Sequence, residues 1–247
     1  MQNILALTIR EWKAFWYSPV AYVVGAFFFL MQGWVFWLLV AVLTDPRVDP
    51  SWNMSQLFFG TFFYWFSVLI LAPTLTMRTF SEEKRTGTLE TLLTAPVKDW
   101  EVVLSKFLGA WGSYCALWAA TLVYFLILRW YTKLDWGPVL TGYLGTGLIG
   151  AVFVSIGVLA SSMTRNQVIA AVVTFVSTIF IFSIGLMDSF VADPESVKII
   201  QYLSFINHVR DFSKGLLDTR PLVLYLTTTA GALFLTIRAI ASPRWRT

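Results

Sequence analysis

The chain has 247 residues, of which 57% are hydrophobic and 13% charged, with a formal net charge of +4 and a mean hydropathy of +0.69. This composition excludes an ordinary water-soluble domain, in which about a quarter of the residues are charged. No shift in composition along residues 1–247 marks a second domain, so we expect a single bundle embedded in a membrane.

Residues 4–17 predict an amphipathic helix ahead of the first long apolar run. Its large apolar side chains recur at helical spacing: Leu5, Ile9, Trp12 and Trp16. Arg10 and Lys13 lie off this stripe, which is typical of a helix lying in the membrane interface with its indole rings at headgroup depth. The alternative is a plain extension of the first span, against which Pro19 favours a break.

Six apolar runs are each long enough to cross a bilayer, because about 20 residues at about 1.5 Å per residue cover about 30 Å of hydrocarbon. They are residues 20–43, 57–77, 107–128, 139–162, 167–187 and 221–238. The first run is too long for the apolar core of a cleavable signal peptide, so we expect it to remain as an anchor.

Six spans place both ends of the chain on one side of the membrane, and the Lys and Arg residues indicate which side. With the N-terminus inside, the inner segments hold eleven of the 18 basic residues. Because basic residues favour the cytoplasmic side, we expect both termini in the cytoplasm of a bacterial inner membrane. This asymmetry also accounts for the net charge, so we expect no nucleic acid as a partner.

The charged segment 78–106, between the second and third runs, predicts two short helices parallel to the membrane surface. Thr79 and Glu82 have the spacing of a capping box, Pro96 would end a helix, and Asp99 would cap the segment entering the third span. Three leucines would leave an exposed apolar face unless a partner covered it: Leu89, Leu92 and Leu93. The alternative is a solvated loop that holds two spans apart.

Residues 189–217 predict an external helical hairpin before the last span. Asp193, Pro194 and Glu195 form a helix start, with a carboxylate cap, a proline in the first turn and an acid beside it. Asn207 could cap a second short helix, which Gly215 would end. The hairpin could serve as a gate, or it could simply cover the last two spans.

Catalytic and metal chemistry is not supported by the sequence. His208 and Cys115 are the single histidine and cysteine, which excludes a metal site of the His and Cys type, and we expect His208 to be solvated. There is no G-x-x-x-x-G-K-[ST] phosphate loop, and no charge falls in the middle of a span. An ATP-driven process would therefore need a separate ATPase.

The polar and small residues within the spans favour helix packing. We expect the polar ones to bond neighbouring helices rather than to form a substrate site: Gln32, Ser67, Thr74, Thr76, Ser155 and Ser177. A cluster of small residues suits close helix contact: Gly142, Gly145, Gly147, Gly150 and Ala151. A seam between two copies of the chain is the alternative for that cluster.

The run MRTFSEEKRTGTLE from Met77 to Glu90, continued by LLTAPV to Val97, resembles the first cytoplasmic loop of type-2 ABC transporter permeases. Within that family it is most similar to the gliding-motility-associated permeases. Further matches are Thr164 to Gln167, Gly215 to Pro221 and the terminal Arg244-Trp245-Arg246. The similarity covers nearly the whole chain.

This resemblance implies an all-α polytopic membrane protein with six spans, an N-terminal interfacial helix, a cytoplasmic coupling helix and short external helices. It also implies two copies of a separate ABC ATPase subunit, a second permease that is identical or related, and room for an auxiliary extracytoplasmic subunit. ATP and Mg²⁺ would bind the ATPase, and this chain would bind no cofactor directly. The coupling residues are expected to be Glu82, Glu83, Arg85, Gly87, Thr88, Leu89, Glu90, Leu92 and Leu93.

The function expected is that of a permease subunit of an ATP-driven exporter, which alternates access by rigid-body motion. A membrane scaffold or a mechanotransmission subunit without transport is the alternative, and an intramembrane enzyme is a further one. The aromatic-rich spans suggest a lipidic or amphipathic cargo, but they equally fit packing against lipid.

Overall fold

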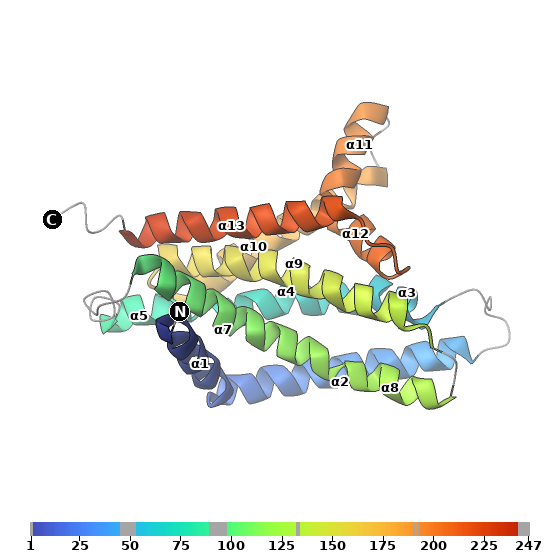
Figure 1. The fold of residues 1–247 in the computed structure, drawn as a ribbon, viewed down its shortest axis with the longest axis horizontal. Coiled ribbons are helices and arrows are strands. Elements are labelled where there is room, and N and C mark those ends of the chain that lie inside the picture. The colour runs from blue at the N-terminus through green and yellow to red at the C-terminus, as the bar shows by residue number, and fades with distance from the viewer. Residues whose placement is uncertain are drawn as a thin grey trace.

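The computed structural model describes residues 2–44, 53–88, 98–131, 134–189, 191 and 193–241. Within these ranges every regular element is a helix, in agreement with the expected all-α class (Figure 1). The longer helices are α1 (Gln2–Trp16), α2 (Pro19–Leu43), α4 (Phe62–Thr76), α7 (Asp99–Ala120), α9 (Trp136–Met163), α10 (Gln167–Ile184) and α13 (Thr219–Ala241). The shorter ones are α3 (Met54–Gly60), α5 (Ser81–Thr86), α8 (Leu122–Tyr131), η1 (Met187–Ser189), α11 (Pro194–Leu203) and α12 (Phe205–Phe212).

The described helices provide enough apolar length for a polytopic membrane protein. Five are long and apolar enough to cross a bilayer: α2, the continuous pair α7 and α8, α9, α10 and α13. A sixth candidate joins α3 and α4, which are bent by 51° at a short break. These six segments correspond to the six apolar runs of the sequence, and the second consists of two helices that meet at the bend.

Threonine side chains stabilise the bend between α3 and α4 and the junction between α7 and α8. At the bend between α3 and α4, Thr61 Oγ1 donates to the carbonyl of Phe58 at 2.9 Å and accepts from the amide of Tyr64 at 3.2 Å. Between α7 and α8, Thr121 Oγ1 donates to the carbonyl of Trp118 at 2.7 Å. These hydroxyls bond backbone groups that an interruption of the helix frees, as a chain that crosses a membrane requires wherever water is excluded.

Helix α9 forms the centre of the bundle, where most of its length is buried and where it packs against α4, α7, α10, α12 and α13. The glycines of α9 allow neighbouring helices to pack closely against it. A methyl group at Gly150 would lie 2.1 Å from Cε1 of Tyr114, so only glycine lets α9 and α7 approach this closely. At Gly150 the small-residue cluster therefore packs within this chain, and not against a second copy.

The polar residues of the spans behave in two ways. Gln32 Nε2 of α2 donates to Ser67 Oγ of α4 at 2.8 Å, which confirms the expected bond between helices. Thr74, Thr76 and Ser155 instead donate to carbonyls of their own helices, each at 2.7 Å. For these three hydroxyls the expectation was wrong, because a carbonyl three or four residues back is always within reach in a helix.

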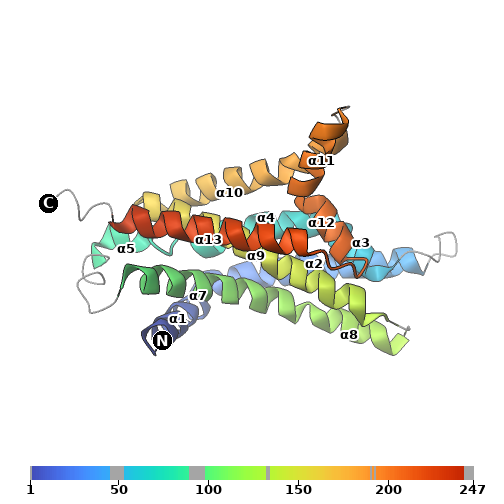
Figure 2. The same ribbon diagram turned by 45° about the horizontal axis from the view of Figure 1, so that its top comes forward.

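Different helices lie at the two ends of the bundle (Figures 1 and 2). We call one the α1 end: it contains α1, α5, the first turn of α7, the turn between α9 and α10, and the last turn of α13. The opposite end, the α11 end, contains α3, α11 and α12. The first described helix, α1, and the last turn of the last described helix, α13, thus lie at the same end of the bundle. An even number of spans requires this arrangement.

Candidate functional site

Helix α5 is held in place at the α1 end by the C-terminal part of α9. The amides of Phe80 and Ser81 both donate to Ser161 Oγ at 3.1 Å, and Ser161 donates in turn to the carbonyl of Met77 at 3.3 Å. A side chain from a distant helix therefore performs the capping that usually comes from the residue before a helix. The result is that α5 cannot shift without moving Ser161 of α9.

A second contact joins α5 to the same part of α9. Lys84 Nζ donates to the carbonyl of Ser162, one of the last carbonyls of that helix. A cation is favoured there because the C-terminal end of a helix carries partial negative charge. Burial, and after it the nearby guanidinium of Arg165, keep the pKa of Lys84 below its usual value.

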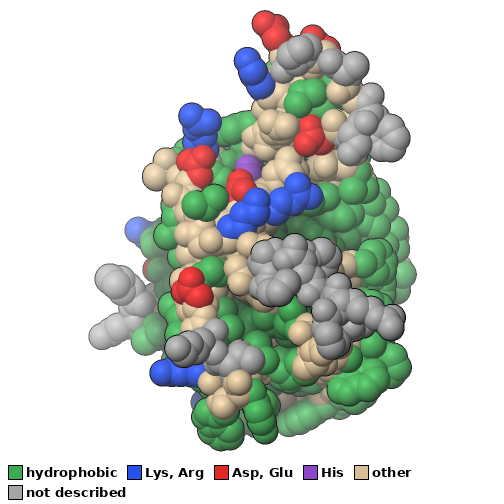
Figure 3. Space-filling view, turned by 90° about the vertical axis from the view of Figure 1, so that its right-hand side faces the viewer, with side chains coloured by type: hydrophobic (Ala, Val, Ile, Leu, Met, Phe, Trp, Pro, Cys, Tyr) green, Lys and Arg blue, Asp and Glu red, His purple; other side chains and the backbone are tan. Residues whose placement is uncertain are grey.

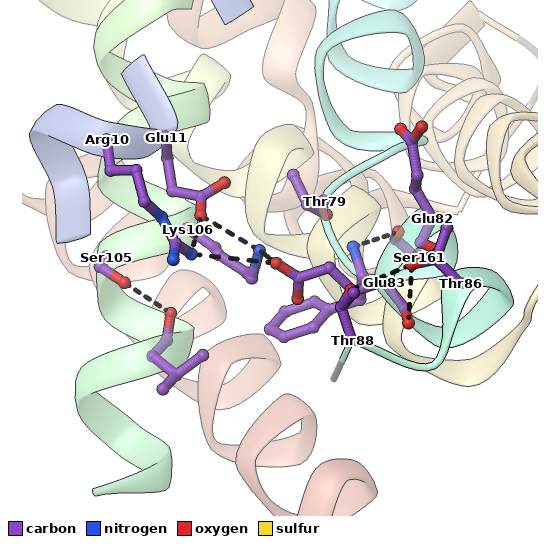
Figure 4. Close-up of polar contacts among 12 residues, drawn as sticks. Arg10, Glu11, Thr79, Glu82, Glu83, Thr86, Thr88, Ser105, Lys106 and Ser161 are labelled. Carbon is purple, nitrogen blue, oxygen red and sulfur yellow. Dashed lines mark hydrogen bonds and ion pairs between the residues drawn. The ribbon is translucent and has the colours of Figure 1, made fainter. Parts of the chain in front are cut away.

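Four charged residues at this end form a set that we call the Lys106 cluster: Arg10, Glu11, Glu83 and Lys106 (Figure 4). Lys106 Nζ of α7 lies 2.7 Å from Glu83 Oε1 of α5 and 3.3 Å from Glu11 Oε1 of α1. Arg10 extends the set, at 2.8 Å from Glu11 Oε1 and 3.9 Å from Glu83 Oε1. One ammonium group thus links three helices.

The Lys106 cluster is partly buried, so its ion pairs affect stability more than ion pairs on the surface do. The Lys106 side chain is 2% exposed, and its ammonium also lies 5.2 Å from the centre of the Phe80 ring. A buried ammonium without a partner loses several kcal/mol of hydration, and the carboxylates of Glu83 and Glu11 offset that loss. Removing one partner of a buried pair typically destabilises a protein by about 3–5 kcal/mol. Lys106 therefore ties the positions of α1 and α5 to the start of α7.

Helix α1 packs closely on α7 beside this cluster. A methyl group at Gly109 would lie 2.8 Å from Cβ of Glu11, so the glycine allows the two backbones to approach. The stripe predicted for the membrane interface is largely exposed. Leu5 is 64% exposed, Ile9 and Trp12 are each 43% exposed, and Trp16 is partly buried. Whether this surface meets lipid stays a prediction.

The predicted coupling residues divide into three groups. Arg85, Gly87 and Thr88 are exposed at the end of α5, where Gly87 closes the helix with a φ of +76°. Glu82 is partly buried, and the carboxylate of Glu83 contacts Lys106 inside the chain. The remaining four lie outside the described residues: Leu89, Glu90, Leu92 and Leu93.

Three capping predictions were wrong. The hydroxyl of Thr79 donates to the carbonyl of Thr76 at 2.8 Å rather than capping α5. Asp99 is the first residue of α7, which follows Lys98 at the cap position. Ser204, not Asn207, caps α12: its hydroxyl accepts from the amide of Asn207 at 3.2 Å. The helix start at Asp193 is confirmed, since its carboxylate accepts from the amide of Ser196 at 3.0 Å.

Sequence reasoning missed the residues that organise this end. The sequence patterns assign no role to Lys106, Glu11 or Ser161, the last of which lies within the fourth predicted span, residues 139–162. A lysine at the edge of an apolar run, facing a carboxylate at the edge of another, was the available signal for the ion pair. Ser161 gave no such signal, because a serine in a span usually donates to its own helix.

The α11 end carries its own polar site (Figure 3). A cavity of about 590 Å³ is lined by residues of α11, α12 and the segment before α13, including His208, Asp211 and Asp218. His208 is 7% exposed and its Nδ1 lies 2.9 Å from the hydroxyl of Tyr225, so the expectation of a solvated histidine was wrong. Burial lowers the pKa of His208, and the carboxylates of Asp211 and Asp218 partly offset that effect.

Among the residues that the structure describes, no group of three or more His, Cys, Asp or Glu side chains could hold a metal ion. A family model described as ABC-2 family transporter protein matches residues 46–219, well over half of the chain. The matched range includes α5, Lys106 and Ser161, whereas α1 with Glu11 precedes it. No curated protein matches the sequence.

Proposed function

The chain belongs to the ABC-2 family of transporter proteins, and we propose that it passes ATP-driven motion from a separate ATPase to its spans through α5. Family membership makes it a multi-pass membrane permease subunit of an ABC transporter. Such a subunit does not hydrolyse ATP itself and works with an ABC ATPase subunit. The direction of transport and the assembly belong to the proposal.

We propose an exporter built from two permeases, identical or related, with two ATPase subunits beneath the α1 end. The excess of basic residues in the segments at this end supports a cytoplasmic location for it. The resemblance of Met77 to Val97 to gliding-motility-associated permeases supports the choice of subfamily.

The Lys106 cluster is the observation that carries the coupling proposal. A force applied to α5 reaches Lys106 of α7 through Glu83, at 2.7 Å, and from there Glu11 of α1, at 3.3 Å. The same force reaches α9 through Ser161 and Lys84. Because α9 packs against most of the bundle, a shift of α5 would become a rigid-body shift of several spans.

Exposure supports a partner surface at the tip of α5. Arg85, Gly87 and Thr88 are exposed, while Glu83 and Lys84 on the same short helix contact the chain itself. One side of α5 is thus attached to the bundle and the other is accessible to another protein. We propose that the ATPase binds this accessible side and the segment that follows it.

The test is a charge reversal on the accessible side. Arg85→Glu should reduce co-purification of the ATPase from membranes by about tenfold, because it replaces one charge of an interface with the opposite one. The matched control is Lys198→Glu, which reverses an exposed charge of α11 at the opposite end. Both variants should insert into membranes like the wild type.

Unchanged ATPase binding by Arg85→Glu would overturn the proposed surface. A wild-type chain that binds no nucleotide-hydrolysing subunit would overturn the coupling proposal and favour a scaffold. Binding that persists while transport-linked ATPase stimulation is lost would support coupling at α5 and place the binding energy elsewhere on the chain.

A further inference from the structure

A cavity of about 490 Å³ lies at the α1 end, between α1, the start of α2, the last turn of α4 and α7. Its wall is mixed in character. Phe15, Val20 and Leu75 are apolar, whereas Ser18 and Thr79 bear hydroxyl groups. A wall of this kind suits the region where the headgroups of a membrane meet its hydrocarbon.

A smaller cavity of about 180 Å³ lies between α2 and α4, and its wall is almost entirely apolar, with side chains such as Val24, Phe27 and Ile70. Its two polar residues are Ser67 and Thr74. Their hydroxyls donate to carbonyls of their own helix, at 2.9 Å and 2.7 Å. This groove therefore presents a hydrocarbon surface.

The two cavities follow one another along the seam between α2 and α4. Thr74 lines both of them. Leu75 of α4 lines the first cavity, and Leu71, one helical turn earlier on α4, lines the second. On α2 the lining runs from Val20 to Met31, a rise of about 16 Å at about 1.5 Å per residue. That is about half of the roughly 30 Å of bilayer hydrocarbon, so the path is one leaflet deep.

The larger cavity is lined by three cations and three anions: Arg10, Arg78, Lys106, Glu11, Glu82 and Glu83. Four of them form the Lys106 cluster. The side chains of the other two, Arg78 and Glu82, make no hydrogen bond or ion pair with any residue in the described part of the chain. A guanidinium and a carboxylate are thus both available to a ligand.

We propose that this path binds one phospholipid of the leaflet at the α1 end, with a phosphoethanolamine headgroup in the larger cavity and an acyl chain in the groove. Arg78 donates to the phosphate, which a guanidinium recognises well. Glu82 accepts from the primary ammonium. A purely anionic headgroup would meet the carboxylate of Glu82 with a like charge, and a quaternary ammonium would offer it no N–H donor.

The apolar wall of the groove favours a lipid over a soluble phosphate compound as the proposed ligand. Burying an acyl chain contributes about 0.8 kcal/mol for each methylene group removed from water. A soluble phosphoethanolamine would leave the apolar wall between α2 and α4 uncovered. The site lies beside the Lys106 cluster, so a bound lipid would also fill the space between α1 and the spans. The inference does not depend on an ATPase.

Native mass spectrometry of the purified full chain, incubated with palmitoyl-oleoyl phosphatidylethanolamine in detergent, tests the proposal. Arg78→Gln should lower the occupancy of bound lipid by about tenfold, as expected for the loss of a charge-assisted hydrogen bond. Ile70→Trp should do the same by filling the groove. The matched controls are Arg238→Gln, an exposed arginine at the same end, and Val172→Trp, an exposed apolar residue of α10; both should retain the lipid.

Equal lipid occupancy in all four variants and the wild type would overturn the site. Equal binding of phosphatidylcholine or phosphatidylglycerol would overturn the headgroup assignment. Displacement of the lipid by free phosphoethanolamine at a similar concentration would overturn the role of the groove. Arg78→Gln and Ile70→Trp should leave ATPase co-purification in place, so this result is separable from that of the Arg85→Glu experiment.

Discussion

Lys106 and Glu83 are brought within 2.7 Å of each other although they lie on separate helices, one at the start of a span and the other on a short helix outside the spans. The contact is held at the junction of α1, α5 and α7, where the ammonium is almost fully buried. The contribution of this ion pair to the free energy of unfolding requires both charges. Neutralising one or both of them therefore measures that contribution.

Glu83→Gln should destabilise the protein, because it leaves the buried Lys106 with one carboxylate, Glu11. The Glu83 side chain is about one-fifth exposed, so the loss should be about 1–3 kcal/mol rather than the full value for a buried pair. Adding Lys106→Met should recover most of this loss, because an apolar side chain of similar length needs no partner. Thermal unfolding in detergent would measure the four members of this double-mutant cycle. Strict additivity of the two changes would contradict the pairing.

Ser161→Ala should loosen α5 without disturbing the rest of the bundle. The substitution leaves the amides of Phe80 and Ser81 without their acceptor, which should cost about 1 kcal/mol, as the loss of a helix cap does. Hydrogen exchange at residues 80–86 should become faster. Ser162→Ala is the matched control, because the Ser162 hydroxyl donates only within α9. Equal exchange in the two variants would exclude Ser161 as the cap.

Gly109→Ala should push α1 away from α7, since the new methyl group would lie 2.8 Å from Cβ of Glu11. We expect a loss of about 1–3 kcal/mol from overpacking. Gly231→Ala in α13 meets nothing within 4 Å and should stabilise its helix by about 0.5–1 kcal/mol. Thermal unfolding of both variants would show opposite signs. A stabilising Gly109→Ala would mean that α1 does not pack at this distance.

His208 should make stability depend on pH at the α11 end. Its pKa in the folded protein is lowered by burial, so the unfolded chain binds more protons at mildly acidic pH. The folded state should therefore lose stability as pH falls from about 6.5 toward the lowered pKa, and this contribution should become constant below it. His208→Gln should flatten the change in unfolding temperature between about pH 7.5 and about pH 5.5. Identical slopes for the two proteins would assign the pH dependence to other groups.

Much of the architecture could be predicted from the sequence. The six apolar runs became the six candidate segments, α2 begins at Pro19 after the end of α1, and Asp193 caps α11. These features are local: hydrocarbon excludes charges over about 20 consecutive residues, and a cap acts within one turn. The set of coupling residues stays a prediction: Arg85, Gly87 and Thr88 are exposed, whereas the carboxylate of Glu83 contacts Lys106 within the chain.

The features that only the tertiary structure decided join residues far apart in the chain. Ser161 caps α5 from 80 residues away, and Glu11 contacts Lys106 from 95 residues away. Tyr225 contacts His208, which the sequence predicted to be solvated. No local pattern encodes such meetings, because each depends on which faces of the helices come together in the bundle. Composition and periodicity determined that the chain spans a membrane, and packing determined which of its few charges are buried together.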